Sequence, residues 1–404
     1  MSQKIKTPII LEVKDPAAGI KGWLALDTLI NNRSCGGLRL CKDISAFEIA
    51  DLAKAMTLKF GFLGLPHGGA KGGIIFEEEA PLEYKSFLLK SFLEKTESML
   101  GDIIYEPYPD LGTNRQCVCD ALRMLGKSMP KRAIVVEKGG WYTSLTVFAG
   151  AKAAAVYKGI DLSKSRVAVE GFGKVGSCVA ENFYRLGSKV VAISTSKGAL
   201  FSAQGLDIPK LISLSRNFGS NVIDNYKEAQ RIERGKLLEL DVDVLLPCAK
   251  GYTINMENVS RVKSKLISPG ANCPASKEAQ KFLFEKGTLY IPCFISNCGG
   301  VLGGTMEFAG FSPEAIAQSI ESVFLKQVSG LIKESLDSGV NLVELAEKIA
   351  MERFGRIKSA AENKSFTKSA FKFGLGLYRN GIVPKFITRK LSREYFNKRL
   401  RGQI

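Results

Sequence analysis

Val167-Ala-Val-Glu-Gly171-Phe-Gly173-Lys-Val-Gly176 is the stretch that decides the fold of this chain. A short β-branched apolar run at residues 167–169 leads into the three glycines of a G-x-G-x-x-G motif. A helical pattern of apolar residues follows at 178–186, and a second strand pattern follows at 189–193. A strand, a glycine turn and a helix in this order predict the first βαβ unit of a dinucleotide-binding sheet.

Each glycine of this motif has a separate physical task. Gly171 permits the tight turn, Gly173 lets a pyrophosphate approach the backbone, and Gly176 lets helix and strand pack closely. The phosphates would lie at the helix N-terminus, so Lys174 and Val175 are also predicted to bind the cofactor. A structural turn without a ligand is the alternative interpretation.

The fold predicted around this motif is α/β with two domains. Strand patterns at 190–193, 242–246, 266–268 and 289–291 alternate with helices and predict a doubly wound parallel Rossmann sheet. We expect an N-terminal α/β substrate-binding and catalytic domain at 1–145 and the dinucleotide-binding domain at 146–312. C-terminal helices at 313–404 are expected to pack partly on the substrate domain, and the Ala-rich helix 147–158 is the expected hinge.

Local patterns subdivide the N-terminal domain. Three strand patterns occupy residues 8–40, and a helical pattern runs from 48 to 59. A second helix is predicted at 83–100, with Phe87, Leu88, Phe92 and Met99 in the core. A strand at 102–105 then leads into a predicted turn at 106–113.

Composition excludes several classes of protein. The 404 residues include no apolar run of membrane-spanning length and no signal-peptide pattern, so we expect a cytoplasmic protein. Nine cysteines without a CxxC pair indicate reduced thiols. The single histidine, His67, argues against a multi-histidine zinc site or a Ser-His-Asp triad, and no metal is predicted.

The net charge of +17 raises the possibility of nucleic-acid binding. The positive charges are spread along the chain and are densest at 385–401, where Leu391, Tyr395 and Phe396 form one apolar stripe. A surface helix with a basic face explains this segment better than a nucleic-acid arm. A basic interaction protein is therefore a minor alternative.

Two lysines stand in a second informative region, Met56-Thr-Leu-Lys59 followed by Gly64-Leu-Pro-His-Gly-Gly-Ala-Lys71-Gly-Gly73. The glycines around Lys71 leave room for a substrate beside its amine. Burial between backbone walls disfavours the ammonium form and lowers the pKa, which makes Lys71 a candidate general base. The alternative is a glycine-rich turn that carries a solvated lysine.

Together these motifs resemble the glutamate/leucine/phenylalanine/valine dehydrogenase family, and most closely its glutamate dehydrogenases. The resemblance runs from about residue 33 to 308 and has the motifs in order. They are Cys-Gly-Gly-Leu-Arg39, Met-Thr-Leu-Lys59, Leu-Pro-His-Gly-Gly-Ala-Lys-Gly-Gly73, Tyr-Pro-Asp110-Leu-Gly-Thr-Asn114, the glycine fingerprint, Leu-Leu-Pro-Cys-Ala249, Pro-Gly-Ala-Asn272 and Ser-Asn297-Cys-Gly-Gly-Val301.

The resemblance implies NAD(P)-dependent, reversible deamination of an L-α-amino acid to a 2-oxo acid. It implies that Lys71 is the catalytic lysine, Asp110 the proton-shuttling carboxylate and Lys59 the partner of the substrate α-carboxylate. These roles fit the chemistry, which needs a base to activate water and a group to move protons. The resemblance also implies that Thr143, Ala249, Asn272 and Asn297 bind the cofactor. It implies that Val301 is a further substrate-binding residue.

Two positions depart from the glutamate-specific pattern. Those enzymes carry a lysine before Gly-Gly-Leu-Arg that pairs with the substrate side-chain carboxylate, and this chain has Cys35 there. They also carry a serine where this chain has Gly304. A buried γ-carboxylate without partners is costly, so an uncharged side chain is favoured over glutamate. We interpret Cys35, Cys273 and Cys298 as small apolar residues, and a redox or metal role is the alternative.

Further predictions concern the choice of cofactor and the assembly. Ser194 and Thr195 stand where NAD-specific enzymes have an acidic residue, and Lys197 follows, which favours NADP or dual use over NAD alone. The resemblance implies a homo-oligomer, a hexamer. A catalytically retired relative that binds dinucleotide and regulates is the alternative function.

Overall fold

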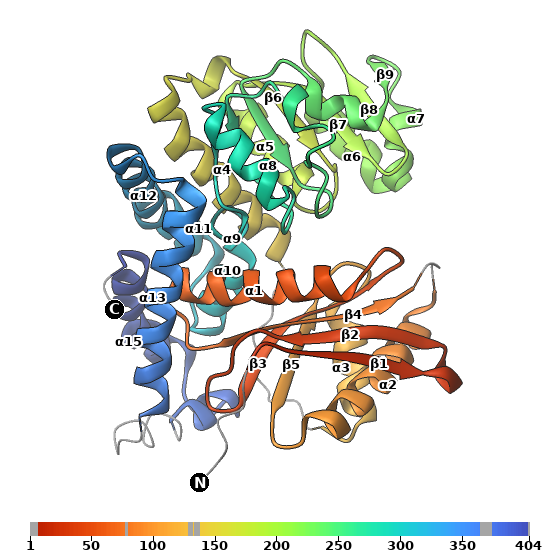
Figure 1. Cartoon of the computed structure of the whole chain (residues 1–404), viewed down its shortest axis with the longest axis vertical. Coiled ribbons are helices and arrows are strands. Elements are labelled where there is room, and N and C mark those ends of the chain that lie inside the picture. The colour runs from red at the N-terminus through yellow and green to blue at the C-terminus, as the bar shows by residue number, and fades with distance from the viewer. Residues whose placement is uncertain (1–6, 77–79, 128–131, 133–137, 364–373, 403–404) are drawn as a thin grey trace. The chain divides into compact units, whose positions relative to one another are not determined.

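The structure is a computed structural model of the chain, and it describes residues 7–76, 80–127, 132, 138–363 and 374–402. The chain divides into two compact units, whose elements are labelled in Figure 1. The first comprises residues 1–135, 349–392 and 404, and the second comprises residues 136–348 and 393–403. The C-terminal stretch therefore contributes residues to both units.

The first unit is built on a five-stranded mixed sheet in the order β1-β2-β4-β3-β5. Its strands are β1 (Ile9–Asp15), β2 (Ile20–Leu26), β3 (Arg33–Cys41), β4 (Gly68–Ile75) and β5 (Ile104–Pro109). Strand β3 pairs in parallel with both β4 and β5, whereas β2 pairs antiparallel with β1 and β4. The predicted turn at 106–113 is wrong in its first part, because residues 106–109 extend β5.

Helix α1 (Ala46–Leu63) packs on one face of this sheet (Figure 1). The Ser45 hydroxyl accepts a hydrogen bond from the Glu48 N–H at the start of α1, and Gly64 ends the helix at a φ of 72°. The helix is longer than the predicted 48–59 because these two caps lie outside the apolar pattern. Helices α2 (Leu82–Leu100) and α3 (Arg115–Met124) belong to the same unit.

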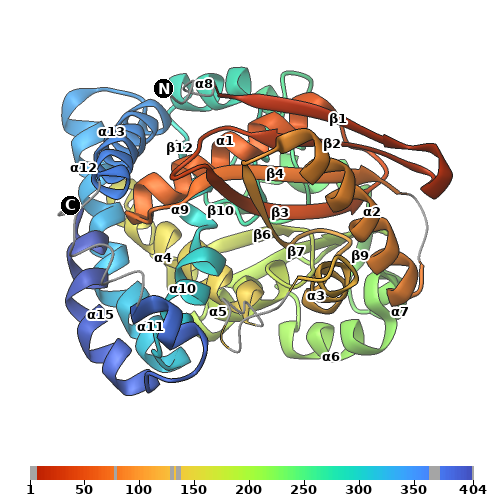
Figure 2. The same ribbon diagram turned by 90° about the horizontal axis from the view of Figure 1, so that it is seen from below.

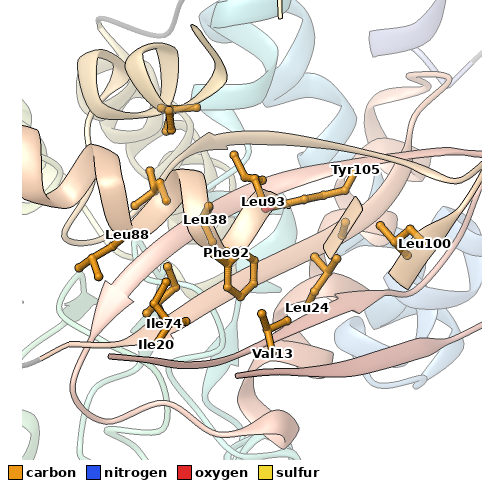
Figure 3. Packing of buried hydrophobic residues seen from close by; sticks show 14 of the residues in the cluster. Val13, Ile20, Leu24, Leu38, Ile74, Leu88, Phe92, Leu93, Leu100 and Tyr105 are labelled. Carbon is orange, nitrogen blue, oxygen red and sulfur yellow. The ribbon is translucent and has the colours of Figure 1, made fainter. Parts of the chain in front are cut away.

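The hydrophobic core of the first unit lies between the sheet and α2 (Figure 3). Leu88 and Phe92 are buried in it, as the helical pattern predicted. Phe87 and Met99 were predicted in the core, and that prediction is wrong because they are 44% and 50% exposed. The Phe87 ring instead stacks on Tyr84, one turn earlier on the same helix.

The second unit contains a seven-stranded sheet in the order β12-β11-β10-β6-β7-β8-β9, and its middle strands can be followed in Figure 2. Its strands are β6 (Arg166–Glu170), β7 (Lys189–Thr195), β8 (Gly198–Phe201), β9 (Gln230–Ile232), β10 (Val244–Pro247), β11 (Leu266–Ile267) and β12 (Leu289–Tyr290). The first five in spatial order run parallel, which confirms the predicted doubly wound α/β sheet. Two antiparallel strands, β8 and β9, extend it and were not predicted.

The other α-helices of the described chain lie in the second unit or in the C-terminal stretch. They are α4 (Gly139–Lys158), α5 (Gly176–Leu186), α6 (Ile208–Phe218), α7 (Val222–Asn225), α8 (Lys277–Glu285), α9 (Cys293–Ser296), α10 (Gly299–Phe308), α11 (Pro313–Ser319), α12 (Leu325–Ser338), α13 (Leu342–Glu362) and α15 (Lys385–Leu400). A π-helical segment, Ile320–Phe324, joins α11 to α12. Short 3-10 helices cover Pro16–Ala18, Leu162–Lys164, Gly219–Asn221, Arg234–Glu239 and Val259–Arg261. None of the described helices is both long and apolar enough to cross a membrane.

The basic C-terminal helix α15 does not present one uniform apolar stripe. Leu391 is 75% exposed, whereas Phe396 is 4% exposed and packs edge-on against Phe311. The three apolar residues that the sequence placed on one stripe therefore have different environments. Phe396 anchors the helix end in the second unit, while Leu391 remains at the surface.

Candidate active site

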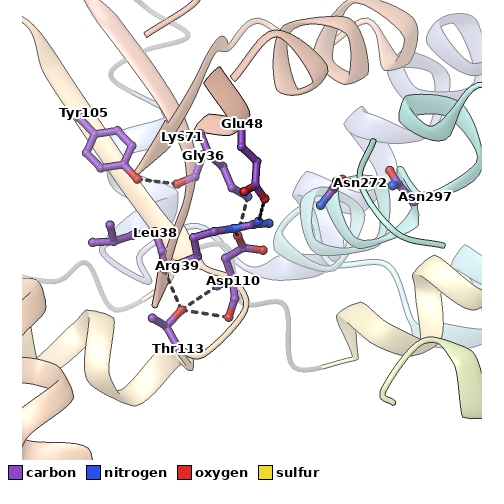
Figure 4. Close-up of polar contacts among 10 residues, drawn as sticks. All are labelled: Gly36, Leu38, Arg39, Glu48, Lys71, Tyr105, Asp110, Thr113, Asn272 and Asn297. Atoms are coloured by element: carbon purple, nitrogen blue, oxygen red, sulfur yellow. Dashed lines mark hydrogen bonds and ion pairs between the residues drawn. The ribbon is translucent and has the colours of Figure 1, made fainter. Parts of the chain in front are cut away.

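Lys71 and Asp110 form a buried ion pair in the first unit (Figure 4). The Lys71 Nζ lies 2.7 Å from Asp110 Oδ2, and the Lys71 side chain is only 4% exposed. Arg39 Nε donates to the same carboxylate oxygen at 2.7 Å, and its Nη1 donates to Glu48 Oε1 at 2.8 Å. Two cations and two carboxylates thus form one network on the sheet.

Strand register explains why these residues meet. In β3, β4 and β5, alternate residues point to the same face of the sheet, so Gly37, Lys71 and Tyr108 share a face. Gly37 is essential to this arrangement, because a Cβ there would lie 2.9 Å from Lys71 Nζ and 2.8 Å from Asp110 Cβ. The glycine-rich motif therefore makes room for the lysine head group.

The turn after β5 fixes Asp110. The Asp110 N–H donates to the Thr113 hydroxyl at 2.8 Å, and that hydroxyl donates to the Leu38 carbonyl at 2.9 Å. On β5 itself, the Tyr105 hydroxyl donates to the Gly36 carbonyl of β3 at 3.1 Å. These bonds hold the carboxylate against β3, so its position depends on backbone contacts as well as on its charge partners.

Burial and charge shift both members of the pair. Burial lowers the pKa of Lys71 to about 8, although the Asp110 carboxylate opposes this change. Arg39 and Lys59 add repulsion that also lowers the pKa of Lys71. Burial would raise the pKa of Asp110, but Lys71 and Arg39 outweigh it and hold that pKa well below its usual range. Asp110 is therefore ionised, and Lys71 can lose its proton near neutral pH.

Lys59 and Cys35, two further predicted site residues, lie in the same unit. Lys59 is on α1 and is 5% exposed, and its charge reaches Lys71. Cys35 is on β3 and is also 5% exposed, directly opposite Glu106 of β5 in the strand register. Burial and the Glu106 charge raise the pKa of the Cys35 thiol, so it is protonated. Neither Cys35 nor its neighbour Glu106 offers a cation at this position.

The glycine fingerprint has the local geometry that a dinucleotide turn requires. Gly171 adopts a φ of 89°, in the left-handed region that favours glycine. A Cβ on Gly176 would lie 1.9 Å from the Gly171 carbonyl oxygen, whereas a Cβ on Gly173 would meet nothing within 4 Å. The first and third glycines therefore serve the turn and the packing, and the second leaves the backbone open. Lys174 and Val175 form the step into α5, which begins at Gly176.

Ser194 and Thr195 end strand β7, as predicted, but their hydroxyls have local partners. Ser194 Oγ accepts a hydrogen bond from the Gly171 N–H at 3.0 Å. Thr195 Oγ1 donates to the Ser220 carbonyl at 2.8 Å. Arg231 of β9 also lies at this strand end, where it donates to the Lys197 carbonyl at 2.8 Å and forms an ion pair with Asp224. Arg231 could not be predicted from the sequence, because it follows the fingerprint by more than 50 residues and strands β8 and β9 were not predicted.

Asn297 and Asn272 are in contact in the second unit, and Figure 4 labels both. Asn297 Nδ2 donates to the Ala271 carbonyl at 2.7 Å and to Asn272 Oδ1 at 3.1 Å. Asn297 Oδ1 is buried and has no hydrogen-bond partner among the described residues. A buried acceptor without a donor is costly, so this oxygen fits the amide or hydroxyl donor of a bound ligand.

Other predicted cofactor residues also lie close to the glycine turn or to α10. Ala249 is so close to Gly171 that a Cβ on this glycine would lie 2.7 Å from the Ala249 Cα. Thr143 Oγ1 on α4 accepts a hydrogen bond from the Gly300 N–H at 3.2 Å, at the start of α10. Val301 and Gly304 lie on α10 in the second unit, and Gly304 is buried. Their role in substrate binding stays a prediction.

Two acidic residues near these sites, Glu48 and Glu170, were not predicted from the sequence. Glu48 follows the Ser45 cap of α1, and only the fold brings it to Arg39. Glu170 ends β6 just before the glycine turn, and Thr253 Oγ1 donates to its carboxylate at 2.9 Å. Burial raises the pKa of Glu170 to about 7, so this carboxyl is partly protonated beside the fingerprint at neutral pH.

Two family models match this chain. Residues 9–122 match the family described as Glu/Leu/Phe/Val dehydrogenase, dimerisation domain, and residues 140–363 match Glutamate/Leucine/Phenylalanine/Valine dehydrogenase. An NADP-specific glutamate dehydrogenase of Saccharolobus shibatae is 32% identical over 71% of this chain and 70% of its own length. An NAD-specific glutamate dehydrogenase of Staphylococcus aureus strain COL is 32% identical over 66% of each chain.

A solved structure is similar to the whole fold. The hetero-hexameric glutamate dehydrogenase of Thermus thermophilus, in its Leu-bound form, has a TM-score of 0.73 and 24% identity to this chain. The similarity covers 89% of this chain and 91% of that one. At 24% identity, this similarity shows that the two chains share a fold.

Proposed function

Because this chain belongs to the glutamate/leucine/phenylalanine/valine dehydrogenase family, we propose that it catalyses reversible, NAD(P)-dependent oxidative deamination of an L-α-amino acid. The products are a 2-oxo acid and ammonia. As a member of this family the chain is an amino acid dehydrogenase, an oxidoreductase that acts on a CH–NH2 group. The residues that perform the chemistry and the identity of the amino acid form the finer part of the proposal.

The observation that carries the proposal is the buried Lys71–Asp110 pair, with its 2.7 Å contact and the lowered pKa of the lysine. A neutral Lys71 amine can take a proton from water as that water attacks the carbon that bears the nitrogen. Asp110 lies within proton-transfer distance of this amine. While Lys71 and Arg39 are both charged, Asp110 is a weak base, so we assign its proton transfers to the steps in which Lys71 is neutral.

Lys59 completes the proposed substrate site as a fixed positive charge. A buried ammonium group attracts the α-carboxylate, which every amino acid substrate carries, and orients the α-carbon. The same charge lowers the pKa of Lys71, so it also favours the base form of that residue. Binding and catalysis are thereby linked through one cluster of cations.

The second unit would hold the nicotinamide dinucleotide. The open backbone at Gly173 and the N-terminus of α5 fit its pyrophosphate, and the buried Asn297 Oδ1 fits a donor group near its nicotinamide end. When bound, the oxidised cofactor supplies the acceptor for the hydride that leaves the α-carbon. Thr143, Ala249 and Asn272 are proposed to line the same binding site.

The residues at the end of β7 favour NADP as the cofactor, or the use of both NADP and NAD. The described residues at this turn, from Thr195 to Gly198, include no carboxylate that would repel a 2′-phosphate, and Arg231 lies beside them. Replacing Arg231 with Ala should raise KM for NADP at least several-fold and change KM for NAD little, since only NADP carries the phosphate. Arg216→Ala, on the neighbouring α6, is the control. Equal effects on both cofactors would contradict this assignment.

The substrate side chain is the point at which this chain departs from its glutamate-specific relatives. Cys35 occupies the position of their carboxylate-binding lysine, and its thiol is buried and protonated. A γ-carboxylate there would lose its hydration, and Arg33, whose charge reaches Cys35, is already paired with Glu106. We therefore propose a preference for amino acids with an uncharged side chain.

A panel of amino acids tested with NAD and with NADP, followed by the absorbance of the reduced nicotinamide, tests the proposal. We expect turnover of at least one uncharged amino acid and poor discrimination in favour of glutamate. Cys35→Lys should raise kcat/KM for glutamate, and adding Gly304→Ser should raise it further, whereas Cys41→Lys on the same strand should not. A chelator-treated wild type that is strongly selective for glutamate would overturn the substrate proposal. Dinucleotide binding without turnover of any amino acid would instead support the retired, regulatory alternative.

A further inference from the structure

Cys35, His67 and Glu106 form a second polar cluster in the first unit, and the mechanism above uses none of their donor atoms together. The thiol sulfur, one imidazole nitrogen and one carboxylate oxygen all lie within 4.8 Å of one another. Cys35 and Glu106 face each other across β3 and β5. His67 is the only histidine of the chain, and it precedes Gly68, which pairs with Ser34 in the register of β3 and β4.

We propose that these three side chains bind a divalent metal ion of the zinc type. Thiolate, imidazole and carboxylate are the protein ligands that Zn²⁺ uses, and three of them with one open position form the usual open zinc site. Ligands around tetrahedral zinc lie roughly 3.3–3.6 Å apart, given metal–ligand bonds of about 2.0–2.3 Å. The present separations of up to 4.8 Å therefore close with small side-chain rotations.

The surroundings hold these ligands in place, and the positive charges of two arginines also act on His67. Cys35 is buried, and the ring of His67 packs against Phe60 with ring centroids 5.3 Å apart, so both donors are held in place. Arg33 donates to Glu106 Oε1, which leaves the second carboxylate oxygen as the candidate ligand. A ligating carboxylate that also accepts from an arginine is a common second-shell arrangement.

Metal binding at this cluster releases one proton. The Cys35 thiol loses its proton to the solvent as the sulfur–metal bond forms, while His67 binds as neutral imidazole and Glu106 as carboxylate. No electron is transferred. Two negative ligands then neutralise the divalent ion, and Arg33 remains paired with Glu106 outside the metal's immediate shell.

The position of the cluster gives the metal a specific consequence, and this part rests on the function proposed above. Cys35 and Glu106 each stand two residues before Gly37 and Tyr108, the register positions beside Lys71, so the two sites are about 7 Å apart along the strands. The family places a lysine cation at this position, and Zn²⁺ at Cys35 would instead bind an anionic oxygen directly. Its open coordination position would accept an oxygen of an acidic or amide side chain.

Cobalt substitution tests the metal site without any substrate. Chelator-treated, reduced full-length protein is titrated with Co²⁺ alone under anaerobic conditions. We expect one equivalent to produce the visible bands of tetrahedral cobalt and a sulfur-to-cobalt charge-transfer band, both abolished by one equivalent of Zn²⁺. Cys35→Ser should remove the charge-transfer band, and His67→Gln and Glu106→Gln should each weaken Zn²⁺ binding by at least about 100-fold, which exceeds the usual second-shell effect.

Cys41→Ser is the matched control, because it removes a thiol from the same strand outside the cluster. A charge-transfer band that survives in Cys35→Ser would place the metal on another thiol and overturn the proposal, as would the absence of the band in wild type. Circular dichroism confirms that each variant is folded, and a Zn²⁺-dependent rise in the Tm of wild type, lost in Cys35→Ser, is a second expected result.

Kinetics separate this inference from the proposed function. With Zn²⁺ bound, kcat/KM for glutamate should rise relative to that for an uncharged amino acid, and Cys35→Ser should show no such rise. An inactive protein that still gives the cobalt spectrum would leave the metal site standing and remove only the proposed function. An active dehydrogenase that gives no cobalt spectrum would remove the metal site and leave the proposed function standing.

Discussion

Asp110 neutralises two buried cations through one oxygen atom, and this makes it the most sensitive residue of the candidate site. Its Oδ2 contacts both Lys71 and Arg39 at 2.7 Å. The glycine at position 37 keeps the space around this contact free of any side chain. Small changes here should therefore alter charge and chemistry before they alter packing.

Replacing Lys71 with Ala should abolish turnover and leave dinucleotide affinity nearly unchanged, because the fingerprint belongs to the other unit. Removal of a general base costs about 10²–10⁴-fold in kcat. Steady-state kinetics and cofactor titration by fluorescence measure the two effects, with exposed Lys42→Ala as the control. A variant with near-wild-type kcat would show that Lys71 is not the base.

The lowered pKa of Lys71 sets a pH dependence. Only the neutral amine acts as a base, so kcat/KM for deamination should rise as pH increases through about 8, the pKa of the buried lysine. Without the Asp110 carboxylate, which raises this pKa, the profile of any residual activity should shift to lower pH. A pH–rate profile that is flat from pH 7 to 9 would contradict the assignment.

Replacing Asp110 with Asn should lower kcat strongly while substrate and cofactor still bind, because the amide keeps the shape and loses the charge. The change also leaves Lys71 and Arg39 buried without this partner, which should cost about 3–5 kcal/mol of unfolding free energy. Kinetics and urea unfolding measure the two effects, and exposed Asp102→Asn is the control. Unchanged kcat with a large rise in KM would identify Asp110 as a binding residue instead.

At the scale of elements, β4 shows how a glycine-rich stretch becomes a central strand. Glycine weakens a strand in general, since it contributes no side chain and loses much backbone entropy. Here the glycines let α1 approach the sheet: a Cβ on Gly69 would lie 2.3 Å from the Thr57 backbone nitrogen and 2.7 Å from the Ala53 carbonyl oxygen. The close approach of α1 brings Lys59 to the face of the sheet that carries Lys71.

Gly69→Ala should therefore destabilise the first unit. The added methyl group meets backbone atoms that cannot move without shifting α1, and such overpacking costs about 1–3 kcal/mol or more. Thermal unfolding measures the change. Gly235→Ala is the matched control, because a Cβ there meets nothing within 4 Å and the backbone φ is not positive. Equal Tm values for the two variants would show that α1 and β4 are packed less closely.

At the scale of the whole molecule, the chain has a surface that fits self-association. Strand β1 is an edge strand of the first sheet, and Ile10 on it is 48% exposed. An exposed strand edge with apolar side chains is a template for pairing with another chain. We infer that the protein assembles as a homo-oligomer, and the family resemblance implies six copies.

Light scattering during gel filtration should then give a particle of six times the 44.0 kDa chain mass. Ile10→Lys should lower the mass, because a charge on the edge strand opposes pairing, while Lys14→Glu on the same strand tests for a charge effect without loss of an apolar contact. A monomer at micromolar concentration would contradict the assembly. An unchanged mass in Ile10→Lys would place the interface elsewhere.

The fold class, the glycine turn after β6 and the family could all be predicted from the amino-acid sequence. These depend on local signals: β-branched runs, the glycine spacing at 171–176, and short motifs such as the one around Lys71. Turn geometry and helix caps are set by neighbouring residues, so such signals can be read along the chain. The same local reasoning failed where tertiary contacts override propensity, as in the glycine strand β4 and the exposed Phe87 and Met99 of α2.

The contacts between distant side chains, in contrast, become visible only in the folded chain. Arg39 and Glu48, Arg231 and the end of β7, and the cluster of Cys35, His67 and Glu106 join residues that no spacing rule connects. Strand pairing aligns Cys35 with Glu106 and brings β9 beside β8, and the packing of α1 on the sheet brings Glu48 to Arg39. Burial in that register then sets the charge states of Lys71 and Asp110, which depend on every neighbour at once.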